Sequence, residues 1–200
     1  MKTIDKTNKL TSRDLISLGI FNAIAIIGYM VIGSIACLTI IGMFVSTAAD
    51  FLILGVVYML MAMKVKKRGV FIICGILLAI VGLTFGRIDH AVACVIGGFL
   101  AELIAGKYGN IKRIVIAYVT LAYFDFVGTY LSSFILGVDY FTSVGEKFGM
   151  TAEVMEPYAT YFGGLGFAIL SVVNLICAFL GALIGIGILK KHFKKAGLIK

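Results

Sequence analysis

The sequence is poor in the residues that keep soluble proteins in water. Only 14% of its 200 residues are charged, against about 25% in ordinary soluble domains, while 61% are hydrophobic and the mean hydropathy is +1.09. It has a single proline and no tryptophan. This composition excludes soluble globular, disordered and fibrous proteins, and it indicates a polytopic integral membrane protein.

The cysteines give no sign of a disulfide framework or a metal site. Cys37, Cys74, Cys94 and Cys177 all lie in apolar runs, and none belongs to a CxxC pair. We therefore expect buried, chemically inert thiols. Metalloprotease, P-loop and nucleophile-elbow motifs are missing as well, so we do not expect an enzyme.

Charged residues divide the chain into apolar segments. A spanning helix needs about 20 residues, so the chain has room for about six and for no soluble domain of useful size. The segments predict one all-α membrane domain over residues 1–200, with helices at 15–33, 43–63, 70–86, 91–106, 114–136 and 165–189. The polar stretch 137–164 is predicted to be an external loop.

Lysine and arginine are distributed unevenly between the two sides of this arrangement. The N-terminal tail, the loop between the second and third helices, the loop between the fourth and fifth, and the C-terminal tail hold four, four, three and five of the 18. Arg87 and Lys147 alone fall on the other side. Because cytoplasmic loops carry the excess of basic residues, we expect both termini in the cytoplasm and the protein in the cell membrane. The net charge of +8 then reflects topology rather than nucleic-acid binding.

Two aspartates lie within the apolar segments. Asp50 is expected in the outer half of the second helix, and Asp125 in the middle of the fifth. Ionisable side chains inside a membrane are costly and are functional candidates by default. The sequence leaves two interpretations open, namely hydrogen bonds that bridge helices and contact with a ligand or ion.

A second group of polar residues is expected at the external turn between the third and fourth helices. Arg87 could hold an anionic group of a ligand, with Asp89 beside it, and His90 could donate or accept a hydrogen bond or bind a metal. The alternative is a solvated turn with a local Arg–Asp pair.

Aromatic and amide side chains extend this candidate pocket. Tyr130, Tyr158 and Tyr161 come from the fifth helix and the external loop, and Asn174 lies about two turns into the sixth helix. The tyrosines could stack on a flat ligand, or they could form an interfacial aromatic belt.

The start of the first helix resembles a known family of transport proteins. Residues 9–23, in which Gly19 and Ala23 are four residues apart, are similar to the Trep-Strep (MptD-like) branch of substrate-binding S components of energy-coupling factor (ECF) transporters. The layout of six helices with basic termini resembles the same family over the whole chain. The resemblance implies an S-component-like bundle.

The resemblance also implies a function and a set of partners. S components capture a micronutrient in an outward-facing pocket and dock on a membrane scaffold protein that carries two ATPases. Gly19 and Ala23 match the small residues that contact the scaffold, with glycine in place of the usual alanine at the first. ATP is then used by the partner subunits only, and no covalently bound cofactor is expected. The remaining partners are a small-molecule substrate and membrane lipid.

The substrate that suits these residues is flat and partly anionic, such as a haem, a flavin or a pterin. We favour haem because some MptD-like systems are associated with haem acquisition, and His90 is the candidate axial ligand. One alternative is a stand-alone secondary carrier or channel that uses Asp50 and Asp125. Another is a membrane enzyme or a purely structural partner.

Overall fold

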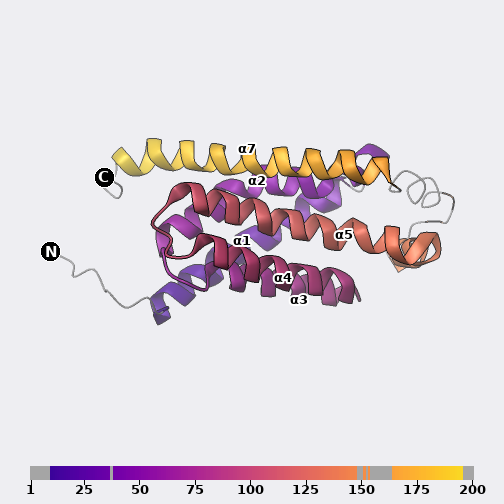
Figure 1. Ribbon diagram of the computed structural model, residues 1–200, viewed down its shortest axis with the longest axis horizontal. Coiled ribbons are helices and arrows are strands. Elements are labelled where there is room, and N and C mark those ends of the chain that lie inside the picture. The colour runs from indigo at the N-terminus through magenta and orange to yellow at the C-terminus, as the bar shows by residue number, and fades with distance from the viewer. Residues whose placement is uncertain (1–9, 37, 148–150, 152, 154–163, 196–200) are drawn as a thin grey trace.

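The apolar segments form helices in a computed structural model, which describes residues 10–36, 38–147, 151, 153 and 164–195 (Figure 1). The helices are α1 (Ser12–Ala36), α2 (Ile40–Val65), α3 (Val70–Thr84), α4 (Ile88–Ala105), α5 (Ile111–Lys147) and α7 (Leu165–Lys195). Within the described residues there is no strand, and the predicted all-α class is confirmed.

Five of these six helices are long and apolar enough to cross a membrane. The exception is α3, whose 15 residues extend about 22 Å at 1.5 Å per residue. A typical hydrocarbon core is about 30 Å thick. The predicted arrangement of six spans is therefore supported for five helices, and for α3 it stays a prediction.

The end of α5 corrects the predicted boundary of the external loop. The helix continues to Lys147, so residues 137–147 are helical rather than part of a loop. The apolar span covers only Ile111–Leu131. We had expected the helix to end where hydropathy falls, but a helix satisfies its own backbone hydrogen bonds, and 132–147 contains no proline to break it. Most of the remaining predicted loop lies outside the described residues.

The start of α4 also differs from the prediction. The helix begins at Ile88 rather than at residue 91, and so Asp89 and His90 lie in its first turn instead of in a loop. An acidic residue is favourable there because the N-terminal end of a helix carries partial positive charge.

Glycines allow two pairs of helices to pack closely. A Cβ atom at Gly181 of α7 would collide with the Phe51 carbonyl oxygen of α2, and one at Gly55 of α2 would collide with the backbone of Gly181. Gly75 of α3 and Gly98 of α4 face each other in the same way. Close backbone approach at small residues is the usual packing mode of membrane helices.

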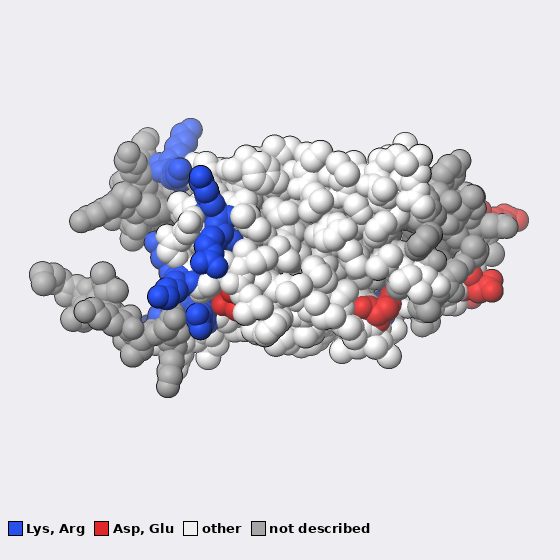
Figure 2. Space-filling view, in the orientation of Figure 1, with Lys and Arg blue, Asp and Glu red and all other residues white. Residues whose placement is uncertain are grey.

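Charge is separated along the bundle. Lysine and arginine gather at the end where α1 begins and α7 ends, and the broad middle of the visible face is almost free of charge (Figure 2). Large apolar side chains are exposed on several helices, including Ile27, Phe99, Ile116 and Val172. This surface suits contact with lipid chains.

Candidate functional site

Arg87, Asp89 and Tyr140, here called the Arg87 cluster, join the start of α4 to α5. Arg87 Nη2 donates to Asp89 Oδ2 at 2.7 Å and to the carbonyl oxygens of Gly128 and Thr129 at 2.8 and 3.1 Å. Tyr140 Oη donates to Asp89 Oδ1 at 2.8 Å. The Arg–Asp pair that the sequence left open is thus present, but the side chains of Arg87 and Asp89 are only 14% and 18% exposed rather than solvated.

Contacts within the Arg87 cluster determine the protonation states of Arg87 and Tyr140. Burial by itself would lower the pKa of Arg87, but the hydrogen bonds and charge of Asp89 raise that pKa above its ordinary value. Burial and the hydrogen bond to Asp89 raise the pKa of Tyr140. Arg87 therefore stays charged and Tyr140 stays a neutral donor at physiological pH.

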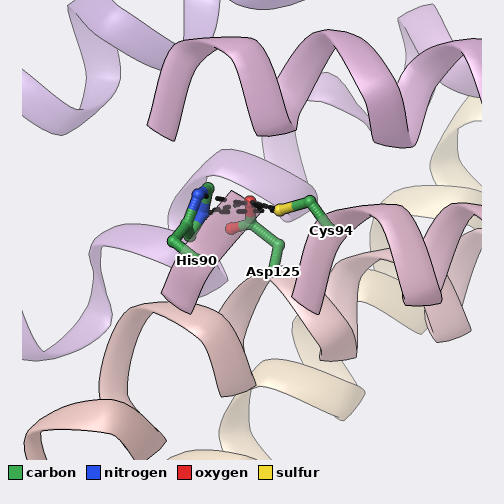
Figure 3. A group of neighbouring side chains, drawn as sticks. All are labelled: His90, Cys94 and Asp125. Atoms are coloured by element: carbon green, nitrogen blue, oxygen red, sulfur yellow. Dashed lines mark hydrogen bonds and ion pairs between the residues drawn. The ribbon is translucent and has the colours of Figure 1, made fainter. Parts of the chain in front are cut away.

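His90, Cys94 and Asp125, here called the His90 cluster, converge deeper between α4 and α5 (Figure 3). His90 Nε2 lies 3.0 Å from Asp125 Oδ1, and Cys94 Sγ lies 3.5 Å from His90 Nε2 and 3.6 Å from Asp125 Oδ1. Tyr29 Oη of α1 donates to Asp125 Oδ2 at 3.4 Å. All three members of the cluster are buried. The carboxylate of Asp125, which would be costly alone in a membrane, therefore has partners from two other helices.

Helix periodicity and two glycines produce this convergence. His90 and Cys94 are four residues apart in α4, so they lie on one face, and that face packs on α5. A Cβ atom at Gly82 of α3 would collide with the His90 ring, and one at Gly128 of α5 would lie 3.0 Å from His90 Cα. Glycine at position 82 makes room for the imidazole, and glycine at position 128 lets α5 approach the backbone of His90 closely.

The position of His90 corrects a sequence-based expectation. We expected it at an open external mouth, yet its side chain is only 7% exposed and it contacts Asp125. Once α4 begins at Ile88, residue 90 lies on the side of the helix that faces α5. Arg87, three residues earlier in the chain, is half-buried.

A third polar group lies at the contact between α2 and α7. Asp50 Oδ1, Ser171 Oγ and Asn174 Oδ1 have no hydrogen-bond partner among the described residues. Asn174 Nδ2 donates to Thr47 Oγ1 at 3.3 Å. An unsatisfied buried polar group costs about 1–3 kcal/mol, so these oxygen atoms favour water or a polar ligand nearby.

The tyrosines of the predicted pocket fall into two groups. Tyr130 is buried, and its hydroxyl lies 3.0 Å from Ser46 Oγ and donates to the Met43 carbonyl oxygen at 2.8 Å, so it joins α5 to α2. Tyr158 and Tyr161 lie outside the described residues.

Gly19 and Ala23 lie on an uncovered face of α1. Both are exposed, and a Cβ atom at Gly19 would meet nothing within 4 Å. Exposed Ile16 and Ile20 flank them. This face is smooth and apolar, and within the described residues no other helix covers it.

Sequence reasoning missed several members of these clusters. It assigned Cys94 to the inert thiols and did not single out Tyr29, Thr47 or Ser171. The spacing of four residues between His90 and Cys94 was the one available signal. Nothing in the sequence indicates that Tyr29 of α1 contacts Asp125.

An apolar groove between α5 and α7 is separate from these polar groups. It is lined by Val115, Ile116, Val119, Thr120, Tyr123, Phe124, Leu175 and Phe179. Because its lining is almost wholly apolar, it suits a lipid chain better than a charged ligand.

Long apolar helices, a visible face whose middle is almost free of charge and buried polar clusters define an integral membrane protein of the helix-bundle class. The model of a family described as hypothetical bacterial integral membrane proteins (Trep_Strep) matches residues 12–195, and the chain belongs to this family. No curated protein and no solved structure matched the chain.

Proposed function

We propose that this chain is the substrate-binding S component of an ECF-type importer in the cell membrane, with both termini in the cytoplasm. It captures a micronutrient from outside and docks on a membrane scaffold protein that carries two ATPases. ATP is used by those partners only. The chain itself catalyses no reaction, carries no covalent cofactor and binds no nucleic acid.

The observation that carries this proposal is the uncovered face of α1 around Gly19 and Ala23. In α1 only Leu18, Asn22 and Ala25 are buried, so most of the helix surface is open to the membrane. Small residues let a partner helix approach its backbone closely. A docking helix of the scaffold is the occupant that this face suits.

The substrate site is proposed in the half of the bundle away from the basic end. The His90 cluster, Asp50 and Asn174 supply buried polar atoms there, and Asp50 and Asn174 each keep an oxygen without a partner among the described residues. Arg87, Asp89, Tyr130, Tyr158 and Tyr161 complete the proposed pocket. A polar ligand would reduce the cost of burying these groups.

Haem is the substrate that we favour within the class of micronutrients. As an axial ligand, the His90 ring would have to exchange its contact with Asp125 for the haem iron. A tyrosine or methionine of the pocket could take the same role.

The docking assignment is tested by adding bulk to the α1 face. We expect Gly19→Leu and Ala23→Leu to leave haem binding by the purified protein intact, because neither residue contacts the polar clusters. Both should abolish ATP-dependent haem uptake in cells that also express the scaffold and the ATPases, and both should abolish co-purification of the scaffold.

Gly33→Leu is the matched control. Gly33 also lies on α1 with nothing within 4 Å of an added Cβ atom, about 21 Å further along the helix. It should retain co-purification and uptake. Normal co-purification of the scaffold with the Gly19→Leu, Ala23→Leu double variant would show that this face is not the docking surface.

A further inference from the structure

We propose that the His90 cluster is a binding site for one divalent transition-metal ion of borderline softness, of which Zn²⁺ is the model case. His90 Nε2, Cys94 Sγ and Asp125 Oδ1 are the three protein ligands. The inference concerns binding by this chain alone, so it does not depend on whether the chain docks on an ECF scaffold. Because the Nε2 lone pair of His90 binds one metal only, the site leaves the axial position of a bound haem to a tyrosine or methionine of the pocket.

The spacing of the three donor atoms matches a tetrahedral site. Bonds of 2.0–2.3 Å at tetrahedral angles place pairs of N, S and O ligands about 3.4–3.6 Å apart. The separations are 3.5 Å for Cys94 Sγ to His90 Nε2 and 3.6 Å for Cys94 Sγ to Asp125 Oδ1. His90 Nε2 and Asp125 Oδ1 are 3.0 Å apart, so a shift of about 0.4 Å would complete the geometry.

The types of donor atom select the class of ion. Imidazole nitrogen and thiolate sulfur favour zinc and its transition-metal neighbours, whereas calcium and magnesium prefer all-oxygen sites. A neutral His90, a Cys94 thiolate and an Asp125 carboxylate balance the charge of a divalent cation. Such neutrality matters because the cluster is buried within apolar helices.

Coordination requires a defined movement of protons. Cys94 binds as the thiolate, so its thiol proton is released to solvent. His90 Nε2 must present a lone pair, so its ring proton moves to Nδ1. The Nε2 hydrogen bond to Asp125 is then replaced by the two metal–ligand bonds.

Neighbouring residues hold the ligands in place. Tyr29 Oη donates to Asp125 Oδ2, which leaves Oδ1 directed at His90 and Cys94. Gly82 fits closely against the His90 ring and thereby restricts it, and Gly128 packs closely on the His90 backbone. Partners of this kind typically change metal affinity by about 10–100-fold. Three protein ligands also leave a fourth tetrahedral position, which suits water or a donor atom of a bound molecule.

Cobalt(II) is the probe for the test, because it replaces zinc and reports on its ligands. The full chain, purified with a tag that contains no histidine and treated with chelator, is titrated with Co²⁺. We expect one equivalent to bind, with the strong visible absorption of tetrahedral cobalt and a near-ultraviolet thiolate-to-cobalt charge-transfer band. Zn²⁺ should displace it, and Mg²⁺ and Ca²⁺ should not.

Variants separate this site from other donors. Cys94→Ser should lose the charge-transfer band, and Asp125→Asn and His90→Gln should weaken binding. Tyr29→Phe should weaken it by about tenfold, the lower end of the range for such partners. Cys74→Ser, which removes another buried thiol outside the cluster, should bind as the unaltered protein does.

Two results would overturn the proposal. The first is a charge-transfer band that persists in folded Cys94→Ser, and the second is the absence of stoichiometric Co²⁺ binding by the folded, unaltered protein. The latter would mean that the cluster is a hydrogen-bonded bridge between helices only. Because the second result is read on the unaltered chain, a variant that fails to fold leaves the test decisive.

Discussion

Two buried aspartates differ in their surroundings at the scale of single residues. Asp125 is fully buried, and His90, Cys94 and Tyr29 surround its carboxylate. Asp50 is 2% exposed and keeps one oxygen without a partner among the described residues. The two aspartates therefore differ: the first is satisfied within the protein, and the second favours an additional group.

The Arg87–Asp89 pair gives a residue-scale prediction. Arg87→Ala should destabilise the protein by about 1.5–3 kcal/mol, because it removes charge-assisted hydrogen bonds and leaves Asp89 half-buried without its cation. The measurement is thermal unfolding of the purified protein in detergent. In the Arg87→Ala, Asp89→Ala double variant the loss should be smaller than the sum of the two single losses. Additive losses would mean that the pair contributes nothing as a pair.

Sequence reasoning at this scale found the ionisable residues and offered the Arg87–Asp89 pair, but it did not find the partners of His90 and Asp125. Arg87, Asp89, His90, Asp50 and Asp125 stood out because charge is rare in apolar segments. Whether each faces a partner, a ligand or lipid depends on the rotation of its helix. That rotation is set by packing against helices distant in the sequence.

At the scale of elements, α3 depends on a cap supplied by another helix. Its N-cap residue Gly69 offers no side chain, but Glu102 of α4 accepts hydrogen bonds from the backbone N–H groups of Gly69 and Phe71 at 2.8 and 3.0 Å. Tyr108 Oη donates to the same carboxylate at 2.7 Å. Burial and this hydrogen bond raise the pKa of Tyr108. The shortest helix is thus anchored at its start by its neighbour.

The contact between α2 and α7 gives an element-scale prediction. Gly181→Ala should destabilise the protein by about 1–3 kcal/mol, because the new methyl group would collide with α2 backbone at Phe51. Gly187→Ala, on the same helix with nothing within 4 Å, should leave stability unchanged or raise it by up to about 1 kcal/mol. Thermal unfolding in detergent compares the two. Equal stability of both variants would contradict close packing at Gly181.

Helix ends followed the prediction at α2 and α3, but α5 and α7 continue into polar or charged segments beyond their predicted ends at 136 and 189. The ends of α2 and α3 lie within two residues of the prediction. The end of α5 lies eleven residues beyond it. A polar segment without proline continues as a helix outside the apolar span, and so loss of hydropathy does not mark a helix end.

At the scale of the whole molecule, the separation of charge predicts the orientation in the membrane. In a background in which the natural cysteines are replaced by serine, Asp5→Cys and Lys195→Cys should react with a membrane-impermeant thiol reagent only after the cells are permeabilised. Glu146→Cys, at an exposed position near the end of α5, should react in intact cells. Labelling of the tails in intact cells would invert the orientation and place the polar clusters on the cytoplasmic side.

The sequence by itself determined the properties that arise from local hydropathy. Low charge and long apolar runs predicted a helical membrane protein and the approximate positions of its helices. The positions of the basic residues along the chain predicted its orientation. Each of these properties depends on stretches of about 20 neighbouring residues and on the loops between them.

The tertiary structure decided which buried groups meet. His90 and Cys94 of α4, Asp125 of α5 and Tyr29 of α1 come together only because three helices pack at particular rotations, with Gly82 making room for the imidazole. Side-chain packing between helices is non-local, and for that reason the sequence predicted an inert thiol at Cys94 where the structure has a cluster of three donor atoms.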